Sequence, residues 1–143
     1  MTDDKYVSWD LKQPGISFCL TEGRITLFKT TMDVLGNPEF YQFLFSPEDR
    51  LFAVQTCGIS DKGANRVRIE ARSDNYSVKT MDLVRFVYQS CRWKEKITYR
   101  VPGVAYPADR AVQFDLAAAY EIHEGRVMEP APRLPEQQKS SSF

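Results

Sequence analysis

Residues 40–56 read FYQFLFSPEDRLFAVQT, and this stretch decides the fold. Two runs rich in aromatic and aliphatic side chains, 40–45 and 51–56, lie on either side of a Ser-Pro-Glu-Asp-Arg segment. Proline and aspartate are common turn residues, and flanking runs of this kind are typical of strands. The pattern therefore predicts an antiparallel β-hairpin.

The sequence on both sides of this hairpin predicts further short strands and two helices. Residues 66–72 alternate strictly between charged and apolar side chains, which is typical of a strand with one face in solvent. A short helix is expected over 32–35 with Thr30 or Thr31 as its cap, and a longer one over 81–91 after Thr80. The other strands are expected at 16–20, 24–28, 76–78, 97–101 and 111–116.

Two motifs occur in both halves of the chain in the same order. TMDVL at residues 31–35 is similar to TMDLV at 80–84, and PEDR at 47–50 is similar to PADR at 107–110. Each half reads as strand, threonine-capped helix, strand, turn and strand. We therefore expect an α+β, strand-rich protein in which duplicated strand-helix-strand-strand units form one compact domain.

The expected organisation has three parts. A single globular domain covers residues 15–126 and contains the two repeats, at about 15–57 and 64–120. Residues 1–14 are polar and form an N-terminal arm. Residues 127–143 are rich in Pro, Gln, Ser and charge, which predicts a disordered tail.

Composition excludes several classes of protein. The 143 residues include 19 basic and 19 acidic side chains, one histidine and three widely spaced cysteines. The zero net charge argues against nucleic-acid binding by bulk electrostatics, and the cysteines suit neither a zinc site nor a disulfide framework. We find no catalytic or nucleotide-binding motif, no membrane-length apolar run and no signal peptide. A cytoplasmic protein that is not an enzyme and takes no metal or cofactor is expected.

Residues 22–56 resemble the AbrB/SpoVT DNA-binding domain. The pattern of that family is a Gly-Arg-Ile turn, a strand, a short capped helix ending in Leu-Gly, and two strands. Gly23-Arg24-Ile25, Leu35-Gly36 and the hairpin match it here. A duplicated version is similar to the MraZ family. The resemblance implies a barrel that binds DNA, regulates transcription and acts as a homo-oligomer. A GyrI-like or TATA-binding-protein-like continuous sheet is the alternative at the level of fold.

The charge is concentrated in the middle of the chain. Residues 62–100 contain ten basic and four acidic side chains. The three arginines of the alternating strand have one parity and would project from the same face, and RWKEK at 92–96 surrounds Trp93 with cations. The predicted contacts to a DNA backbone are Arg24, Arg66, Arg68, Arg72, Arg92, Lys94 and Lys96.

Two functions are consistent with these features. One is a small DNA-binding regulator of transcription that forms a homodimer. The other is a ligand- or protein-binding module with the same duplicated fold and no nucleic-acid role, in which some of the nine Phe, seven Tyr and two Trp line a cleft between the halves. In either case Trp93 is expected to cover the core rather than to stack on a base.

Overall fold

The computed structural model describes residues 13–67, 75–123 and 126–127. All of the strands in this part of the chain belong to one antiparallel sheet, in the order β5-β3-β4-β8-β7-β1-β2-β6, with β9 paired to β7 and β10 to β9. The elements are β1 (Gly15–Cys19), β2 (Arg24–Leu27), α1 (Lys29–Val34), β3 (Phe40–Ser46), β4 (Leu51–Thr56), β5 (Asn65–Arg66), β6 (Tyr76–Lys79), α2 (Met81–Cys91), β7 (Thr98–Tyr106), η1 (Pro107–Asp109), β8 (Ala111–Asp115), η2 (Leu116–Ala118), β9 (Tyr120–His123) and β10 (Arg126–Val127). The predicted strand-rich α+β class is confirmed.

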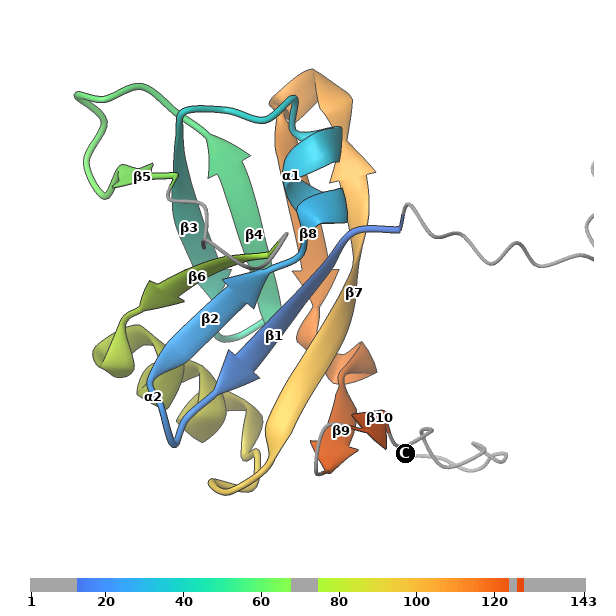
Figure 1. Ribbon diagram of the computed structural model, residues 1–143. Coiled ribbons are helices and arrows are strands. Elements are labelled where there is room, and N and C mark those ends of the chain that lie inside the picture. The colour runs from blue at the N-terminus through green and yellow to red at the C-terminus, as the bar shows by residue number, and fades with distance from the viewer. Residues whose placement is uncertain (1–12, 68–74, 124–125, 128–143) are drawn as a thin grey trace, which may run out of the picture.

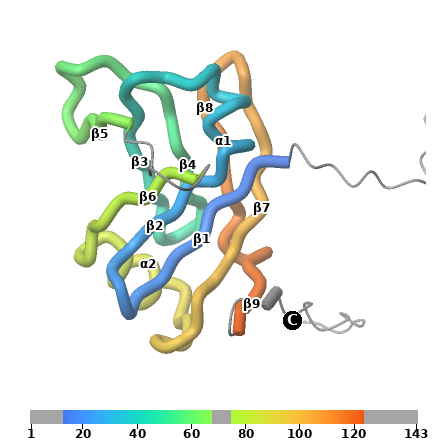
Figure 2. The backbone as a smooth tube through the Cα atoms, viewed as in Figure 1, coloured from blue at the N-terminus to red at the C-terminus, as the bar shows by residue number. Residues whose placement is uncertain are grey.

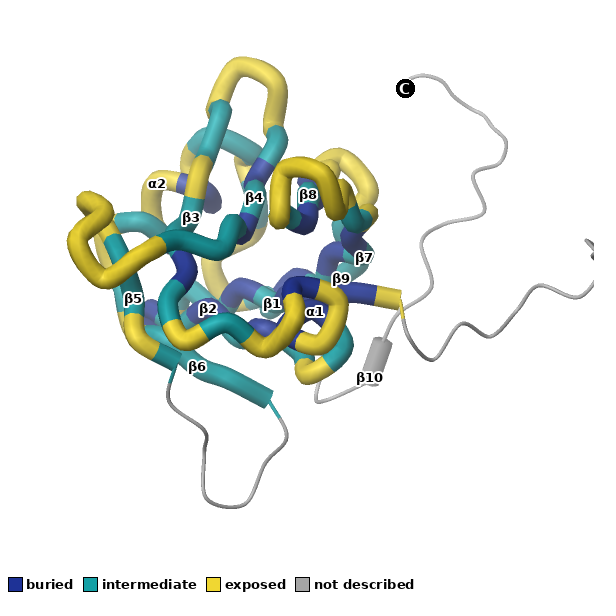
Figure 3. Tube along the Cα trace, turned by 90° about the horizontal axis from the view of Figure 1, so that it is seen from above, coloured by how far each residue is buried: buried dark blue, intermediate teal, exposed yellow. Residues whose placement is uncertain are grey.

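The sheet curls around the core as a half-barrel. α1 lies near one end of the curl and α2 near the other (Figure 1). Buried residues are concentrated in the strands, and the connecting turns are exposed (Figure 3). The core includes four fully buried side chains from the paired strands β4 and β8, namely Phe52, Val54, Val112 and Phe114. The curl therefore separates an apolar inner face from an outer face in solvent.

The hairpin predicted from residues 40–56 is confirmed. β3 and β4 pair from Tyr41 opposite Thr56 to Ser46 opposite Leu51. In the turn, the Arg50 N–H donates to the Pro47 carbonyl, and Arg50 has a φ of 54°. Residues 107–110 make the same turn, because the Arg110 N–H donates to the Pro107 carbonyl and Arg110 has a φ of 53°. The two Pro-x-Asp-Arg motifs therefore occupy equivalent turns.

The two hairpins pair with one another through β4 and β8. Leu51 lies opposite Asp115, and Gln55 lies opposite Ala111. Beyond these pairs, the Thr56 N–H donates to the Arg110 carbonyl (3.0 Å), and the Leu116 N–H donates to the Arg50 carbonyl (2.9 Å). Each residue of the first hairpin has an equivalent 60 positions later in the second. If every residue in these pairs is replaced by its equivalent in the other hairpin, the same set of pairs results. The register is therefore that of a local two-fold axis.

A second contact between the halves has the same symmetry. β2 and β6 pair with Arg24 opposite Lys79 and Leu27 opposite Tyr76. Each residue of β2 has an equivalent 52 positions later in β6, and replacing every residue by its equivalent gives the same pairs. The residues that follow the two strands, Phe28 and Thr80, are the N-caps of α1 and α2. The N-caps are also 52 positions apart, so the unit formed by β2 and α1 is equivalent to the unit formed by β6 and α2.

The prediction for the first helix is wrong in its start and its cap. α1 begins at Lys29, and Thr31 lies inside it, whereas Thr80 is the N-cap of α2. The TMDVL and TMDLV segments therefore do not occupy equivalent positions. The reason is a tertiary contact: the buried Thr31 hydroxyl accepts from the Gly15 N–H (2.8 Å) and donates to the Gly15 carbonyl (2.7 Å). These bonds fasten α1 to the first residue of β1.

β7 continues through Pro102 and Gly103, where the sequence predicts a break. Up to Pro102 the strand pairs with β1, and from Gly103 onward it pairs with β8 (Figure 2). The change of partner explains why proline is tolerated, since it falls where one ladder gives way to the next. A Cβ on Gly103 would lie 2.6 Å from Phe114 and 2.7 Å from Val112, so glycine allows the close approach of β7 to β8.

Parts of the predicted organisation lie outside the described residues. They are residues 1–12 of the N-terminal arm, residues 68–72 of the alternating strand, and the tail from 128 onward. β5 contains the start of the alternating segment, and β10 contains Val127.

The Thr31 bonds lead to a stability prediction. Thr31→Val keeps the shape of the side chain but leaves the buried Gly15 N–H without its partner, although the Gly15 carbonyl still accepts from the Phe28 N–H (3.2 Å). We therefore expect a loss of about 1–3 kcal/mol in the free energy of unfolding. Urea unfolding followed by circular dichroism measures it. Thr30→Val is the control, because the Thr30 hydroxyl makes no hydrogen bond within the described part of the chain. Equal losses in both variants would contradict the assignment.

Gly103 provides a second prediction. Gly103→Ala forces a Cβ against Phe114 and Val112, and overpacking of this kind costs about 1–3 kcal/mol. At Gly58 the nearest contact of an added Cβ would be Asp61 at 3.7 Å, so Gly58→Ala should be nearly neutral. A thermal melt of the two variants compares them directly. A Gly103→Ala protein as stable as Gly58→Ala would show that β7 and β8 are not packed this closely.

Candidate nucleic-acid interface

One end of the molecule gathers cations from segments far apart in the sequence. The Thr80 N–H donates to the Gly23 carbonyl (2.7 Å), which places the start of α2 against the β1–β2 turn. The β2–β6 register then puts Arg24 beside Lys79. The far end of α2 leads into the connection to β7, at the same end of the molecule as the β1–β2 turn (Figure 1). We define the basic end as Arg24, Lys79, Arg85, Arg92, Lys94 and Lys96.

Aromatic side chains hold the connection between α2 and β7 in place. The Tyr88 hydroxyl lies 2.6 Å from the Ile97 carbonyl oxygen, and the Lys94 N–H donates to the Tyr99 hydroxyl (3.0 Å). The Trp93 ring stacks on Tyr99 with 4.3 Å between centroids. Burial raises the pKa of both tyrosines, so their hydroxyls stay protonated at neutral pH. Trp93 packs against the core, as the sequence predicts.

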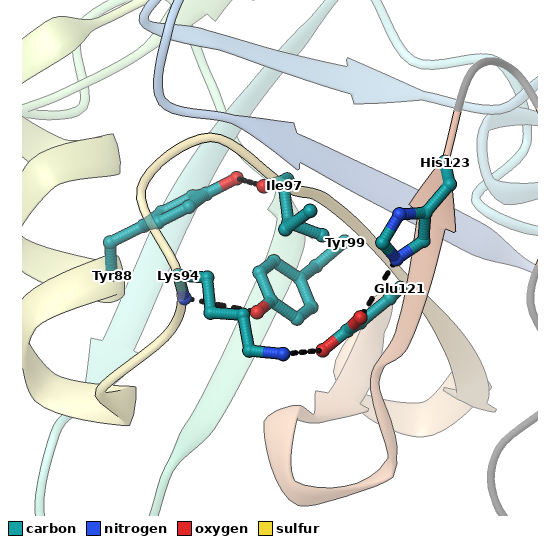
Figure 4. Close-up of polar contacts among 6 residues, drawn as sticks. All are labelled: Tyr88, Lys94, Ile97, Tyr99, Glu121 and His123. Carbon is teal, nitrogen blue, oxygen red and sulfur yellow. Dashed lines mark hydrogen bonds and ion pairs between the residues drawn. The ribbon is translucent and has the colours of Figure 1, made fainter.

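An ion pair links this connection to β9. Lys94 Nζ lies 3.2 Å from Glu121 Oε2, and His123 Nε2 lies 2.8 Å from Glu121 Oε1 (Figure 4). The hydrogen bond with His123, together with Lys94, holds the pKa of the Glu121 carboxyl below its ordinary value. Glu121 therefore stays ionised at neutral pH and offsets part of the positive charge of the basic end.

The predicted contact residues fall into three groups. Arg24, Arg92, Lys94 and Lys96 lie at the basic end. Arg66 lies on β5, in the part of the molecule away from the β1–β2 turn, where it pairs with Glu39 (3.1 Å) and lies over the Phe40 ring (Figure 1). Arg68 and Arg72 lie outside the described residues. The structure therefore brings four of the seven together and separates one from them.

The charge of the basic end is partly compensated. Arg24 pairs with Glu22 (3.0 Å), Arg85 with Asp82 (3.6 Å) and Lys94 with Glu121. Arg92, Lys79 and Lys96 have no ion pair with another residue of the described ranges. Arg24 also keeps a buried Nε without a hydrogen-bond partner in that part of the chain. Six cations against Glu22, Asp82, Glu95 and Glu121 leave a surplus of two.

Sequence reasoning missed Lys79 and Arg85 as members of this surface. Both contribute to the positive charge of residues 62–100, but the strand pairing that brings Lys79 beside Arg24 joins residues 55 positions apart. No local pattern specifies such a pairing. The excess of basic over acidic residues in 62–100 was the available signal. It indicates how much positive charge is present but not where that charge lies in the fold.

A pocket of about 400 Å³ lies at the same end. Its walls are one side of α2, Leu20 in the β1–β2 turn, and the start of the connection to β7. Its charged lining consists of the Arg85 and Arg92 guanidinium groups and the Glu95 carboxylate. The other lining residues are Leu20, Met81, Tyr88, Gln89 and Trp93. The pocket includes residues of both halves, and Tyr88 and Trp93 are the aromatic side chains of its lining.

The described residues contain no group of three or more His, Cys, Asp and Glu side chains arranged to hold a metal ion. Cys19, Cys57 and Cys91 are free. In the same part of the chain, neither helix has the length and apolar character needed to cross a membrane.

No family model, curated protein or solved structure matches this chain.

The depressed pKa of Glu121 predicts how stability depends on pH. A group whose pKa is lower in the folded state stabilises the fold above its unfolded pKa, and this contribution is lost as the pH falls through the folded value. We expect wild type to be more stable than Glu121→Gln at pH 7. The difference should begin to shrink near the ordinary glutamate pKa of 4.5 and be lost once the pH has fallen through the lower folded value. Urea unfolding of both proteins from pH 7 to about pH 3 tests this. A difference that does not change with pH would rule out the ion pair as its source.

Proposed function

We propose that this chain is a cytoplasmic, non-enzymatic protein that binds double-stranded DNA through its basic end and regulates transcription. The observation that carries the proposal is the convergence of Arg24, Arg92, Lys94 and Lys96, joined by Lys79 and Arg85, on one end of a protein with zero net charge. Phosphate contacts provide the sequence-independent part of DNA affinity, and a surface with a small positive surplus gives weak, salt-sensitive binding.

Rigidity of the surface supports this proposal. Tyr88 and Tyr99 fix the backbone of the connection that carries Arg92, Lys94 and Lys96. Cations held by a structured backbone lose less conformational freedom on binding than cations on a free chain. The basic end can therefore meet a phosphate backbone without reorganisation of the protein.

The fold part of the proposal is an internally duplicated barrel of the AbrB/SpoVT type, with two halves as in the MraZ family. Its support is the symmetric register of β4 with β8 and of β2 with β6, together with the equivalent turns at 47–50 and 107–110. In this proposal Arg24 belongs to the Gly-Arg turn of the first half, and it contacts DNA from the position beside Lys79.

The pocket favours a second candidate, a binding module for a small anionic ligand. Arg85 and Arg92 would contact the anion, and Trp93 and Leu20 would contact its apolar part. The Glu95 carboxylate of the same lining and the ion pair of Arg85 with Asp82 reduce the net positive charge available to the ligand. Binding of nucleoside monophosphates by a protein without DNA affinity would favour this candidate over the first.

Fluorescence polarisation with a random-sequence duplex tests DNA binding. We expect micromolar affinity at about 50 mM salt that weakens steeply by about 200 mM. Lys94→Gln should weaken binding and reduce the slope of log K against log salt by about 1. Glu121→Gln should strengthen binding, because it removes the carboxylate that compensates Lys94. Opposite effects of these two changes are difficult to produce by damage to the fold alone.

Arg66→Gln is the matched control for Lys94→Gln. It also removes one cation from an exposed ion pair, but Arg66 lies away from the basic end. We expect its affinity to equal that of wild type. Absence of binding at about 50 mM salt, or equal losses in Arg66→Gln and Lys94→Gln, would refute the proposal.

A further inference from the structure

The outer side of the strands β1, β2 and β6 carries a row of small hydroxyl side chains. The register places Ser17 of β1 next to Thr26 of β2, and Thr26 next to Ser77 of β6. On its other side, Ser17 lies next to Arg100 of β7. The intervening residues of these strands lie in the core or pack against it, so the four side chains point away from the core. We call Ser17, Thr26 and Ser77 the hydroxyl row.

The hydroxyls of this row are open to solvent. None of them forms a hydrogen bond with another residue of the described ranges, and none of the three oxygens is fully buried. Each hydroxyl can donate one hydrogen bond, and neighbouring strands lie about 4.8 Å apart. The row therefore presents three donors at regular intervals across the sheet.

Cations border the hydroxyl row on two sides. Arg24 and Lys79 lie opposite one another at the next outward positions of β2 and β6. At the other end, the guanidinium carbon of Arg100 lies 4.4 Å from the centroid of the Phe28 ring, which holds this cation against the sheet. Neither Arg100 nor Lys79 has an ion pair with another described residue.

This surface has few carboxylates to compensate its cations. The strands β1, β2, β6 and β7 contain no Asp or Glu, although the whole chain has 19 acidic residues. Glu22, in the turn before β2, pairs with Arg24 (3.0 Å). Arg24, Lys79 and Arg100 against this one carboxylate leave a surplus of two positive charges beside the hydroxyl row.

We propose that the hydroxyl row and the cations beside it bind phosphate groups of a DNA backbone, so that the contact with the duplex extends from the basic end onto the outer side of the sheet. The inference rests on the proposed function, and it adds Ser17, Thr26, Ser77 and Arg100 to the residues that contact DNA. Arginine, lysine and hydroxyl side chains are common partners of phosphate oxygens in DNA complexes.

The length of this surface favours a polyanion over a small phosphorylated ligand. From Lys79 on β6 to Arg100 on β7 it crosses three strand spacings, or about 14 Å. Duplex DNA carries about one negative charge per 1.7 Å of its axis, so several phosphates fall within that length. A single phosphate group would contact only neighbouring positions. Such contacts need a strip of donors rather than a flat area, so the curl of the sheet is compatible with them.

Thr26→Val and Ser77→Ala test the hydroxyls, because each change removes a donor and leaves the charge as it is. In fluorescence polarisation with the random-sequence duplex, we expect each to weaken binding about three- to tenfold. The slope of log K against log salt should stay that of wild type, since it depends on the number of phosphates neutralised by cations. Ser60→Ala is the control, because Ser60 is exposed in the loop after β4 and should leave binding unchanged.

Arg100→Gln tests the cation at the far end of the row. We expect weaker binding and a salt slope reduced by about 1. Arg66→Gln is the matched control, since Arg66 also lies over a phenylalanine ring but is away from this surface (Figure 1). Circular dichroism and a thermal melt of each variant show whether a loss of affinity comes from a loss of fold.

Amide NMR shifts of the full wild-type chain on addition of the duplex give a readout that needs no variant. Shifts at Ser17, Thr26 and Ser77 support the proposal. Shifts confined to residues 85–96 would overturn it and leave the proposed function intact, as would normal binding by the Thr26, Ser77 and Arg100 variants when Lys94→Gln binds weakly. Shifts of the same three amides with inorganic phosphate, in a protein that does not bind the duplex, would refute both proposals and indicate a site for a small phosphate.

Discussion

The pairing of β4 with β8 is the contact on which the rest of the structure depends. It joins two hairpins that are separated by about half the chain, and its register fixes which side of each strand faces the core. Phe52 and Val54 meet Phe114 and Val112 on the inner side. The same register fixes the opposite side, because side chains alternate along a strand. One set of backbone hydrogen bonds thus determines which side chains enter the core and which point outward.

The basic end depends on the second contact between the halves. β2 and β6 bring Arg24 beside Lys79, and the hydrogen bond from Thr80 to Gly23 sets the start of α2 against the β1–β2 turn. From there α2 extends to the connection that carries Arg92 and Lys94. The positive surface therefore combines one end of the curled sheet, where Arg24 and Lys79 lie, with α2 and the connection that follows it.

Patterns among residues close together in the sequence predicted local structure correctly. The hairpin at 40–56, the longer helix after Thr80 and the two Pro-x-Asp-Arg turns all depend on neighbouring residues, and the structure has them where they are predicted. The errors came from contacts between distant residues. The Thr31 hydroxyl forms hydrogen bonds with Gly15 instead of capping the start of a helix. β7 continues through Pro102 because its pairing changes there from β1 to β8. For the candidate site, the cations at 92–96 were recognised, and their neighbours Lys79 and Arg85 were not.

The sequence by itself determined most of the strands, the two Pro-x-Asp-Arg turns, the longer helix and an excess of positive charge in the middle of the chain. It did not predict β9. These follow from side-chain periodicity and turn chemistry, which act over a few residues. Only the tertiary structure decided which strands pair, where Arg24 and Arg66 lie relative to one another, and which outward side chains form a continuous surface. The backbone groups that join strands are the same in every residue, so local sequence does not name a partner. The partner is chosen by the burial of the whole set of apolar side chains, and that choice brings cations from distant segments to one end of the molecule.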